Sequence, residues 1–240
     1  MKRHFTGLTD TGIVRTVNQD NYHIDDLGRF CIVADGMGGH AGGQEASKIA
    51  TEEIKAFLAA NWDSTVSSEV LLKEAIEKAN QEILADQQQH PERGDMGTTV
   101  VVSIFRQEKA WCAHVGDSRL YRWRDSCIEQ ITEDHTWVGL ALKAGEINKE
   151  QAKFHPWRHV LSQCLGRKDL HRIDIREIDL KSGDRLLICS DGLTEEVPDD
   201  KIESYLSQKI SSEAAVKELI AAAKQAGGSD NITAILVAQE

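Results

Sequence analysis

Residues 30–36 read Phe-Cys-Ile-Val-Ala-Asp-Gly, five apolar residues that end at an aspartate followed by a glycine. An unbroken apolar run of this length, bounded by a turn signal, predicts a strand with both faces buried. The stretch Leu-Leu-Ile-Cys-Ser-Asp-Gly at residues 186–192 repeats this pattern far along the chain. Two central strands are therefore expected to end in Asp-Gly, at Asp35 and at Asp191.

The elements around these strands come in groups. Apolar runs predict strands at residues 22–24, 29–34, 98–105, 110–115, 118–123, 173–178, 185–189 and 232–237. Apolar stripes at three- and four-residue steps predict helices within residues 46–58, 72–83, 137–143 and 216–223, with a short one after Pro198. The strands do not alternate with single helices, as they would in a parallel β-α-β fold. We therefore predict an α+β fold with packed antiparallel sheets and helices outside.

Composition indicates one domain, residues 1–240, in a reducing compartment. Forty per cent of the residues are apolar, and the three prolines do not gather into a linker. The first residues lack the apolar core of a secretory signal, and no run approaches the ~18 apolar residues of a membrane span. The five cysteines show no C-x-x-C spacing, which argues against disulfides and a thiolate metal site. We expect a cytoplasmic protein with no membrane contact.

The charge balance limits the partners. The 28 basic and 39 acidic residues give a net charge of -11, which disfavours nucleic acid because its phosphates would be repelled. The same charge opposes any phosphate-bearing substrate unless bound cations offset it.

Four aspartates stand where strands begin or end: Asp20, Asp35, Asp191 and Asp230. Each alone is compatible with a plain turn, because Asp-Gly and Asp-Asn are common in loops. Their coincidence changes the interpretation, because bare carboxylates gathered in the interior would repel one another. Oxygen-binding cations such as Mg²⁺ or Mn²⁺ remove that cost, whereas zinc usually recruits histidine or cysteine. Gly36 has no Cβ, so its backbone carbonyl is also expected to reach an ion.

Six segments in order resemble the PPM, or type 2C, family of bacterial metal-dependent protein serine/threonine phosphatases. They are RTVNQD at 15–20, VADGMGGHAGG at 33–43, GTTV at 97–100, HVGDSR at 114–119, SDGL at 190–193 and GSDNIT at 228–233. The resemblance spans nearly the whole chain. It implies a central antiparallel β-sandwich flanked on both sides by pairs of helices, a four-layer αββα fold.

The resemblance also implies a metal centre. Asp35 would bridge two Mn²⁺ or Mg²⁺ ions, with the Gly36 carbonyl on one and Asp191 and Asp230 on the other. Asp117 matches the family position associated with a third, weaker metal.

The implied reaction is hydrolysis of phosphoserine and phosphothreonine on proteins. A water or hydroxide bridging the two metals would attack phosphorus in line, without a covalent intermediate. By resemblance, Arg15 would clamp the phosphoryl oxygens and Asp20 would hold metal-bound water. His40 is the candidate acid for the leaving alkoxide, with a surface histidine in a mobile loop as the equal alternative. Gln19 stands where eukaryotic relatives carry glutamate, so one metal is expected to rely more on water.

Several side chains near these motifs have plainer expected roles. Without G-x-S-x-G or a cysteine loop rich in glycine and arginine, Cys189 and Ser190 are expected to pack in a strand. Thr98 and Thr99 are expected to begin a buried strand.

Residues 134–165 resemble the family's flap beside the metal centre and are expected to govern access for protein substrates. The expected partners are phosphorylated proteins and an opposing serine/threonine kinase, and we expect a monomer. Because the chain ends at Glu240 after its last strand, a free-standing catalytic domain is expected.

Two alternatives remain open. A catalytically dead relative that binds phosphoproteins as a scaffold would have lost Asp35, Asp191 or Asp230, but all three are present. A two-metal phosphodiesterase or nuclease would need a basic groove, which the acidic balance disfavours.

Overall fold

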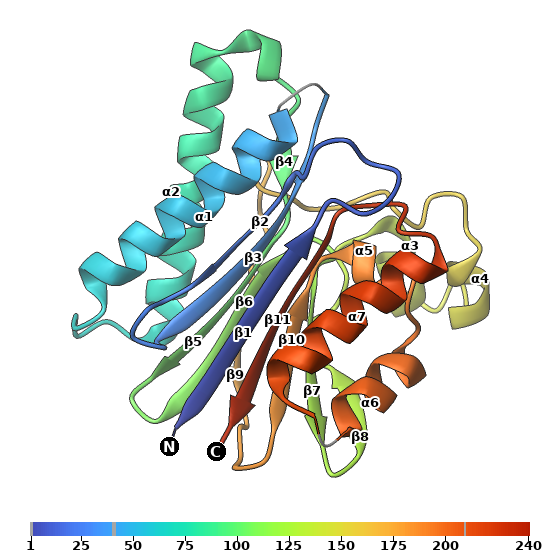
Figure 1. The fold of residues 1–240 in the computed structure, drawn as a ribbon. Helices are drawn as coiled ribbons and strands as arrows, with labels where there is room; N and C mark the ends of the chain where they lie inside the picture. Colours follow the sequence, from blue (N-terminus) through green and yellow to red (C-terminus); the bar gives the residue numbers. More distant parts are fainter. Residues whose placement is uncertain (1, 40–41, 209) are drawn as a thin grey trace.

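Two antiparallel sheets lie face to face at the centre of the molecule (Figure 1). The computed structural model describes residues 2–39, 42–208 and 210–240. The first sheet runs in the order β1 (Arg3–Asp10), β11 (Ile232–Gln239), β10 (Arg185–Cys189), β7 (Arg119–Arg124) and β8 (Cys127–Gln130). The second runs β2 (Asp20–Ile24), β3 (Phe30–Met37), β5 (Val100–Arg106), β6 (Lys109–Val115) and β9 (Asp174–Ile178), with the short β4 (Gly97–Thr98) paired to β3.

Helices cover the outer face of each sheet (Figure 1). The pair α1 (Gly42–Asn61) and α2 (Ser68–Gln89) packs on the second sheet, and the pair α6 (Asp199–Ser207) and α7 (Ser212–Ala226) packs on the first. The remaining helical pieces are short: a 3₁₀ turn (Pro91–Arg93), α3 (Trp137–Lys143), α4 (Lys149–Lys153) and α5 (Asp191–Thr194). The predicted α+β sandwich with four layers is confirmed.

The position of strand β3 explains why the apolar run at residues 30–34 has no polar face. Cys31 and Val33 point into the layer between the two sheets. Phe30, Ile32 and Ala34 point the other way, into the layer beneath α1 and α2. Successive side chains of a strand alternate between faces, so a strand covered on both faces must be apolar throughout.

The predicted strands are confirmed with small shifts at their ends. Strands β1 and β8 and helices α4 and α5 were not predicted. Four of the five cysteines are buried and Cys127 is exposed, so the core packing predicted for Cys31, Cys112 and Cys189 is confirmed. Within the described ranges, no helix combines the length and hydropathy that a membrane span requires.

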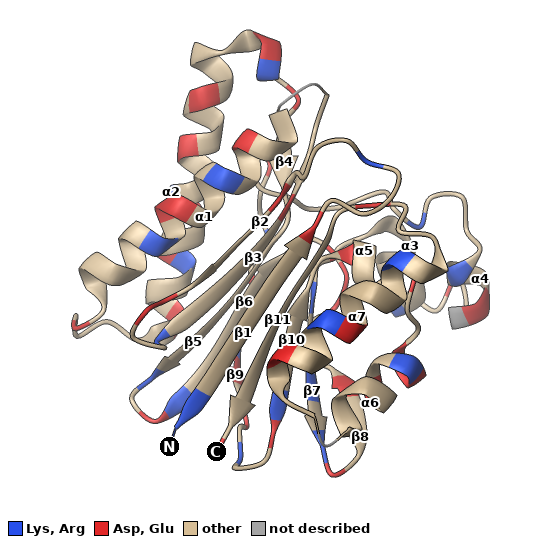
Figure 2. Cartoon of the chain, in the orientation of Figure 1, with Lys and Arg blue, Asp and Glu red and all other residues tan. Residues whose placement is uncertain are grey.

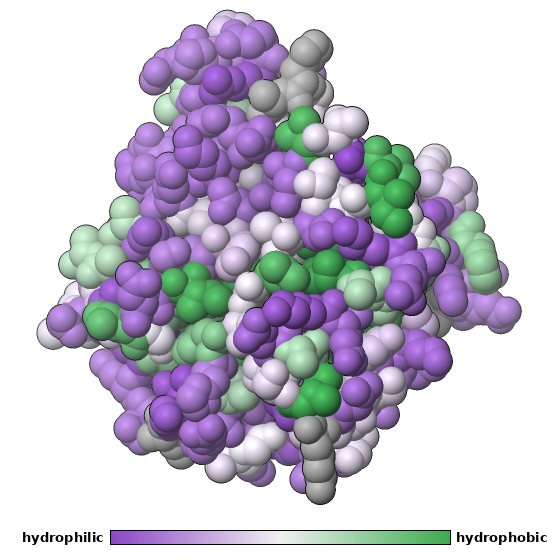
Figure 3. Space-filling model, viewed as in Figure 1, coloured by the Kyte–Doolittle hydropathy of each residue, from purple (hydrophilic) through white to green (hydrophobic). Residues whose placement is uncertain are grey.

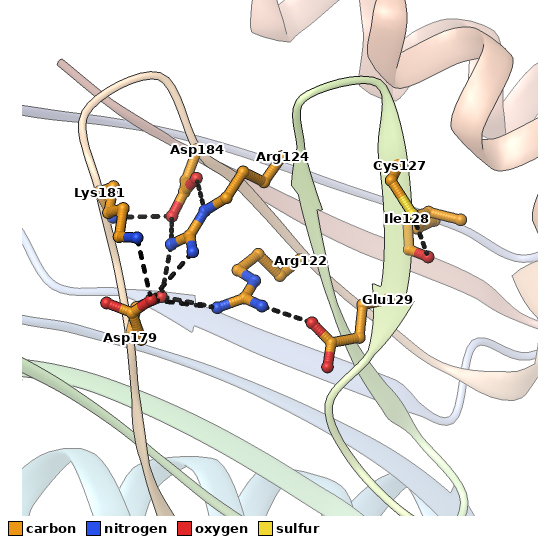
Figure 4. Close-up of polar contacts among 8 residues, drawn as sticks. All are labelled: Arg122, Arg124, Cys127, Ile128, Glu129, Asp179, Lys181 and Asp184. Atoms are coloured by element: carbon orange, nitrogen blue, oxygen red, sulfur yellow. Dashed lines mark hydrogen bonds and ion pairs between the residues drawn. The ribbon is translucent and has the colours of Figure 1, made fainter.

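A network of ion pairs ties the strands together at one end of the sheets (Figure 4). Arg124 of β7 pairs with Asp184, just before β10, through two hydrogen bonds of 2.7 and 2.6 Å. The carboxylate of Asp184 is 1% exposed. Arg122 pairs with Glu129 and with Asp179. The β7–β10 register pairs Trp123 with Arg185, so this network is at the opposite end from Asp191.

Candidate metal centre

The aspartates singled out in the sequence meet at one end of the two sheets. Asp20 and Asp35 are direct cross-strand partners on β2 and β3 of the second sheet. Asp191 begins α5 immediately beyond β10, and Asp230 precedes β11, which pairs with β10 in the first sheet. Figure 2 shows acidic residues at the strand ends beside α5. Both sheets therefore deliver carboxylates to the same place.

Asp20 joins the two sheets through hydroxyl groups. Its Oδ2 accepts hydrogen bonds from Ser190 Oγ at 2.7 Å and from Thr233 Oγ1 at 2.6 Å. Ser190 Oγ also accepts from the Thr233 backbone N–H at 3.0 Å. Ser190 thus does more than the strand packing predicted for it, because it helps to orient Asp20. The sequence signal was only its place beside Asp191.

Among the described residues, two carboxylate oxygens in this cluster lack a protein partner. Asp20 Oδ1 and Asp191 Oδ1 are buried and make no hydrogen bond within the described ranges. A buried, unpaired carboxylate oxygen is costly, so such atoms indicate a ligand outside the protein. A divalent cation, which oxygen ligands suit, would meet both.

The acidity of the cluster supports the same interpretation. Burial raises the pKa of Asp35 and of Asp117 well above their ordinary values, and nearby carboxylates, Asp191 among them, add to both shifts. Burial also raises the pKa of Asp191. Burial raises the pKa of Asp20 to about 7 against the hydrogen bonds from Thr233 and Ser190. Carboxyl groups held together in this way favour a bound cation, because it removes their mutual repulsion.

Gly36 is required by the backbone around it. A Cβ built there would lie 2.0 Å from the carbonyl oxygen of Gly43 and 2.6 Å from that of Gln19. The Gly36 N–H donates to the Gln19 carbonyl at 3.2 Å. Only glycine permits this close approach. The Gln19 side chain donates from Nε2 to the Gly38 carbonyl at 3.4 Å.

Arg15 lies at the rim of the cluster. Its Nη2 donates to Asp230 Oδ2 at 2.7 Å, and its side chain is 50% exposed. The loop that carries Arg15 is fixed by Asn231, whose Nδ2 donates to the carbonyls of Thr11 and Val17, both at 3.0 Å. Asn231 was not singled out from the sequence, although its place directly after Asp230 was a signal.

Asp117 follows a glycine bend between β6 and β7. Gly116 has φ +107 and donates its N–H to His135 Nδ1 at 3.2 Å. His135 Nε2 in turn lies 3.2 Å from Asp174 Oδ2. Because Nδ1 accepts, the ring proton is on Nε2 and points to Asp174. His135 therefore supports the bend that positions Asp117, a contact that the sequence did not reveal.

The two threonines of the GTTV segment support Asp35. Thr98 Oγ1 donates to the Asp35 carbonyl at 2.8 Å, and the Asp35 N–H donates to Thr99 Oγ1 at 3.2 Å. Both threonines are buried, as predicted. Their hydroxyls hold the backbone of Asp35 from both sides, which the sequence pattern had not indicated.

His40, the candidate acid, lies outside the described residues. The other predicted site residues, with the glycine carbonyl beside Asp35, form one group at the strand ends.

The protein phosphatase 2C family model matches residues 13–236 of this chain. The chain belongs to the protein phosphatase 2C family. It is 36% identical over 246 residues to the serine/threonine phosphatase stp of Listeria monocytogenes, covering 99% of this chain and 96% of that protein. The crystal structure of the serine/threonine phosphatase PstP/Ppp of Mycobacterium tuberculosis superposes with a TM-score of 0.89 at 34% identity, covering 99% of both chains.

A structure of the PstP catalytic domain in complex with two manganese ions matches with a TM-score of 0.84 at 32% identity, covering 98% of this chain and 97% of that chain. These similarities identify a serine/threonine protein phosphatase, and dependence on divalent metal is general to the 2C family. The chain is therefore an enzyme that acts on phosphorylated proteins.

In this 2C phosphatase, the segment between β8 and β9 lies beside Asp191 as well as beside the Asp117 bend. His159 Nδ1 pairs with Glu195 Oε1 just beyond α5, and potential ligand atoms of His159, Glu195 and Asp191 lie within 4.8 Å of one another. Burial raises the pKa of Glu195 to about 7, and the nearby Asp191 carboxylate adds to the shift. The contact places part of the predicted flap beside the carboxylate cluster.

Proposed function

We propose that this 2C phosphatase hydrolyses phosphoserine and phosphothreonine with two divalent ions, Mn²⁺ or Mg²⁺, held by Asp35, the Gly36 carbonyl, Asp191 and Asp230. The observation that supports this assignment is the buried carboxylate cluster, in which Asp20 Oδ1 and Asp191 Oδ1 lack a partner within the described residues. The two manganese ions in the related PstP structure support the number of ions. Asp117 is the proposed ligand of a third ion.

The ions would supply an activated water and would neutralise charge on the phosphoryl oxygens. The chain contributes orientation. Arg15 uses Nη2 on Asp230 and is half exposed, so its other nitrogens are available to phosphoryl oxygens, which a planar guanidinium matches well. Asp20 has Oδ2 fixed by two hydroxyls, and we assign Oδ1 to accept a hydrogen bond from the attacking water. His40 is proposed to give a proton to the leaving serine or threonine alkoxide.

Residues 134–165 act as a flap of a single 1–240 domain, supported by the His159–Glu195 contact. A phosphoprotein substrate requires a kinase that makes it, so the enzyme is proposed to oppose a serine/threonine kinase in the cytoplasm, as a monomer.

The test is hydrolysis of a phosphothreonine peptide by the purified chain with Mn²⁺. We expect phosphate release that excess chelator abolishes and that Asp35→Asn lowers at least ~100-fold, because that variant replaces a charged carboxylate of the proposed site by a neutral amide. Asp169→Asn, which changes an exposed aspartate paired with Arg167, is the control and should retain activity.

Activity that survives the chelator would overturn the metal mechanism. Binding of the peptide without hydrolysis would favour a scaffold, and turnover of bis(p-nitrophenyl) phosphate but not the peptide would favour a phosphodiesterase.

A further inference from the structure

The loop between β1 and β2 exposes apolar side chains on both sides of Arg15. Ile13 is 62% exposed, Val14 is 67% exposed and Val17 is 45% exposed. Figure 3 shows hydrophobic surface over this loop. Isolated exposed apolar residues are ordinary, but three within five residues form an apolar patch, which is typical of an interaction site.

Hydrogen bonds hold the backbone of this loop in place. The N–H groups of Ile13 and Val14 both donate to the Gly228 carbonyl, at 2.8 and 3.3 Å. Gly12 has φ +80, and a Cβ there would lie 2.2 Å from the Asp230 carbonyl oxygen. Asn231 holds the carbonyl of Val17. The patch is therefore a rigid feature attached to the residues that carry Asp230.

A second apolar segment lies near Asp191. Trp157 is 54% exposed and Val160 is 50% exposed, and they flank His159, which pairs with Glu195 beside Asp191. The Val160 carbonyl accepts a hydrogen bond of 2.8 Å from the N–H of Trp137, the first residue of α3. Two separate segments therefore place exposed apolar side chains next to carboxylates of the cluster.

We propose that Ile13, Val14 and Val17, together with Trp157 and Val160, form an apolar rim that binds the residues flanking the phosphorylated serine or threonine of a protein substrate. This inference rests on the proposed function, because the phosphoryl group is proposed to bind at Arg15 and the aspartates, next to both segments. A polypeptide bound there would place the side chains next to its phosphorylated residue close to the rim. Apolar neighbours are favoured because both partners then lose exposed apolar surface.

The test compares two phosphothreonine peptides of equal length and charge, one with valine on both sides of the phosphothreonine and one with serine. For the wild type with Mn²⁺, kcat/KM should favour the valine peptide about three- to tenfold, as expected for partial burial of valine-sized groups. The double change Ile13→Ser and Val14→Ser should lower this ratio towards one, because it removes two of the five rim side chains. Using a ratio within each variant cancels any general change in activity.

Leu27→Ser is the matched control. Leu27 is 75% exposed in the turn between β2 and β3, at the far end of these strands from Asp20 and Asp35. It should keep the wild-type ratio. Val17→Ser alone, a second variant, should lower the ratio in part. An unchanged ratio in the double variant, or no preference in the wild type, overturns the rim. Failure of the wild type to hydrolyse either peptide or p-nitrophenyl phosphate would instead contradict the proposed function.

Discussion

Asp20 is the residue at which the two sheets and the metal centre meet. One of its oxygens is held by hydroxyls of the first sheet, while its backbone pairs with Asp35 in the second. Its other oxygen is buried and unpaired within the described ranges. The residue therefore orders the site at a cost in stability when no cation is bound.

That cost predicts a pH dependence of the metal-free protein. The folded chain keeps the Asp20 proton up to a pKa of about 7, whereas the ordinary value is 3.8. Between these values the folded state binds more protons than the unfolded state, so stability falls as pH rises, by up to about 1.4 kcal/mol per pH unit. Below this window the cost is absent, and above pH 7 it stays constant.

Urea denaturation in chelator at pH 4 to 8 measures this effect. Asp20→Asn should gain stability relative to the wild type as pH rises to 7, and then gain no more. Asp169→Asn is the control, because Arg167 lowers the pKa of that exposed carboxyl. A difference between Asp20→Asn and wild type that does not grow with pH would contradict the assignment.

At the scale of elements, most strands were predictable because apolar runs between turn residues are a local signal. Strand β1 was missed because Arg3–Asp10 mixes polar residues and a glycine among few apolar ones. It forms through eight pairs with β11. A glycine is needed at position 7, because a Cβ there would lie 2.7 Å from Tyr22 Cε2 of β2. Only the neighbouring strands give this segment its structure.

The ion pair between β7 and the turn before β10 gives a stability prediction. Arg124→Ala leaves the buried carboxylate of Asp184 without its guanidinium and should cost about 2 kcal/mol, below the ~3–5 kcal/mol of a fully buried pair because Arg124 is 20% exposed. Arg122→Ala, whose partners Glu129 and Asp179 are exposed, should cost less than about 1 kcal/mol.

Urea denaturation at neutral pH compares the two arginine variants. Equal losses of unfolding free energy in the two variants would show that the burial of Asp184 does not make the Arg124 ion pair more stabilising. Turnover of p-nitrophenyl phosphate by folded Arg122→Ala should match the wild type, since this network is at the opposite end of the sheets from Asp191.

At the scale of the whole molecule, the net charge of -11 and the buried aspartates predict stabilisation by Mn²⁺. A site filled at 100 times its Kd contributes about 2.7 kcal/mol, which for a chain of this size is roughly 5–10 °C in Tm. Thermal unfolding with Mn²⁺ and with KCl at the same ionic strength separates specific binding from screening of the net charge. Asp35→Asn should lose most of the Mn²⁺ shift. A shift that KCl reproduces would argue against a metal centre.

The fold class and the set of aspartates at the strand ends could be predicted from the sequence, because apolar runs ending in Asp-Gly are local patterns and six motifs stand in a family's order. The sequence also indicated Arg15, Gly36 and Asp117. The groups that hold these residues became visible in the folded chain: Ser190 and Thr233 on Asp20, Thr98 and Thr99 on Asp35, Asn231 beneath the Arg15 loop, and His135 behind Asp117. The reason is physical. A strand's burial depends on the residues it contains, whereas a hydrogen bond between distant segments depends on the packing of both sheets.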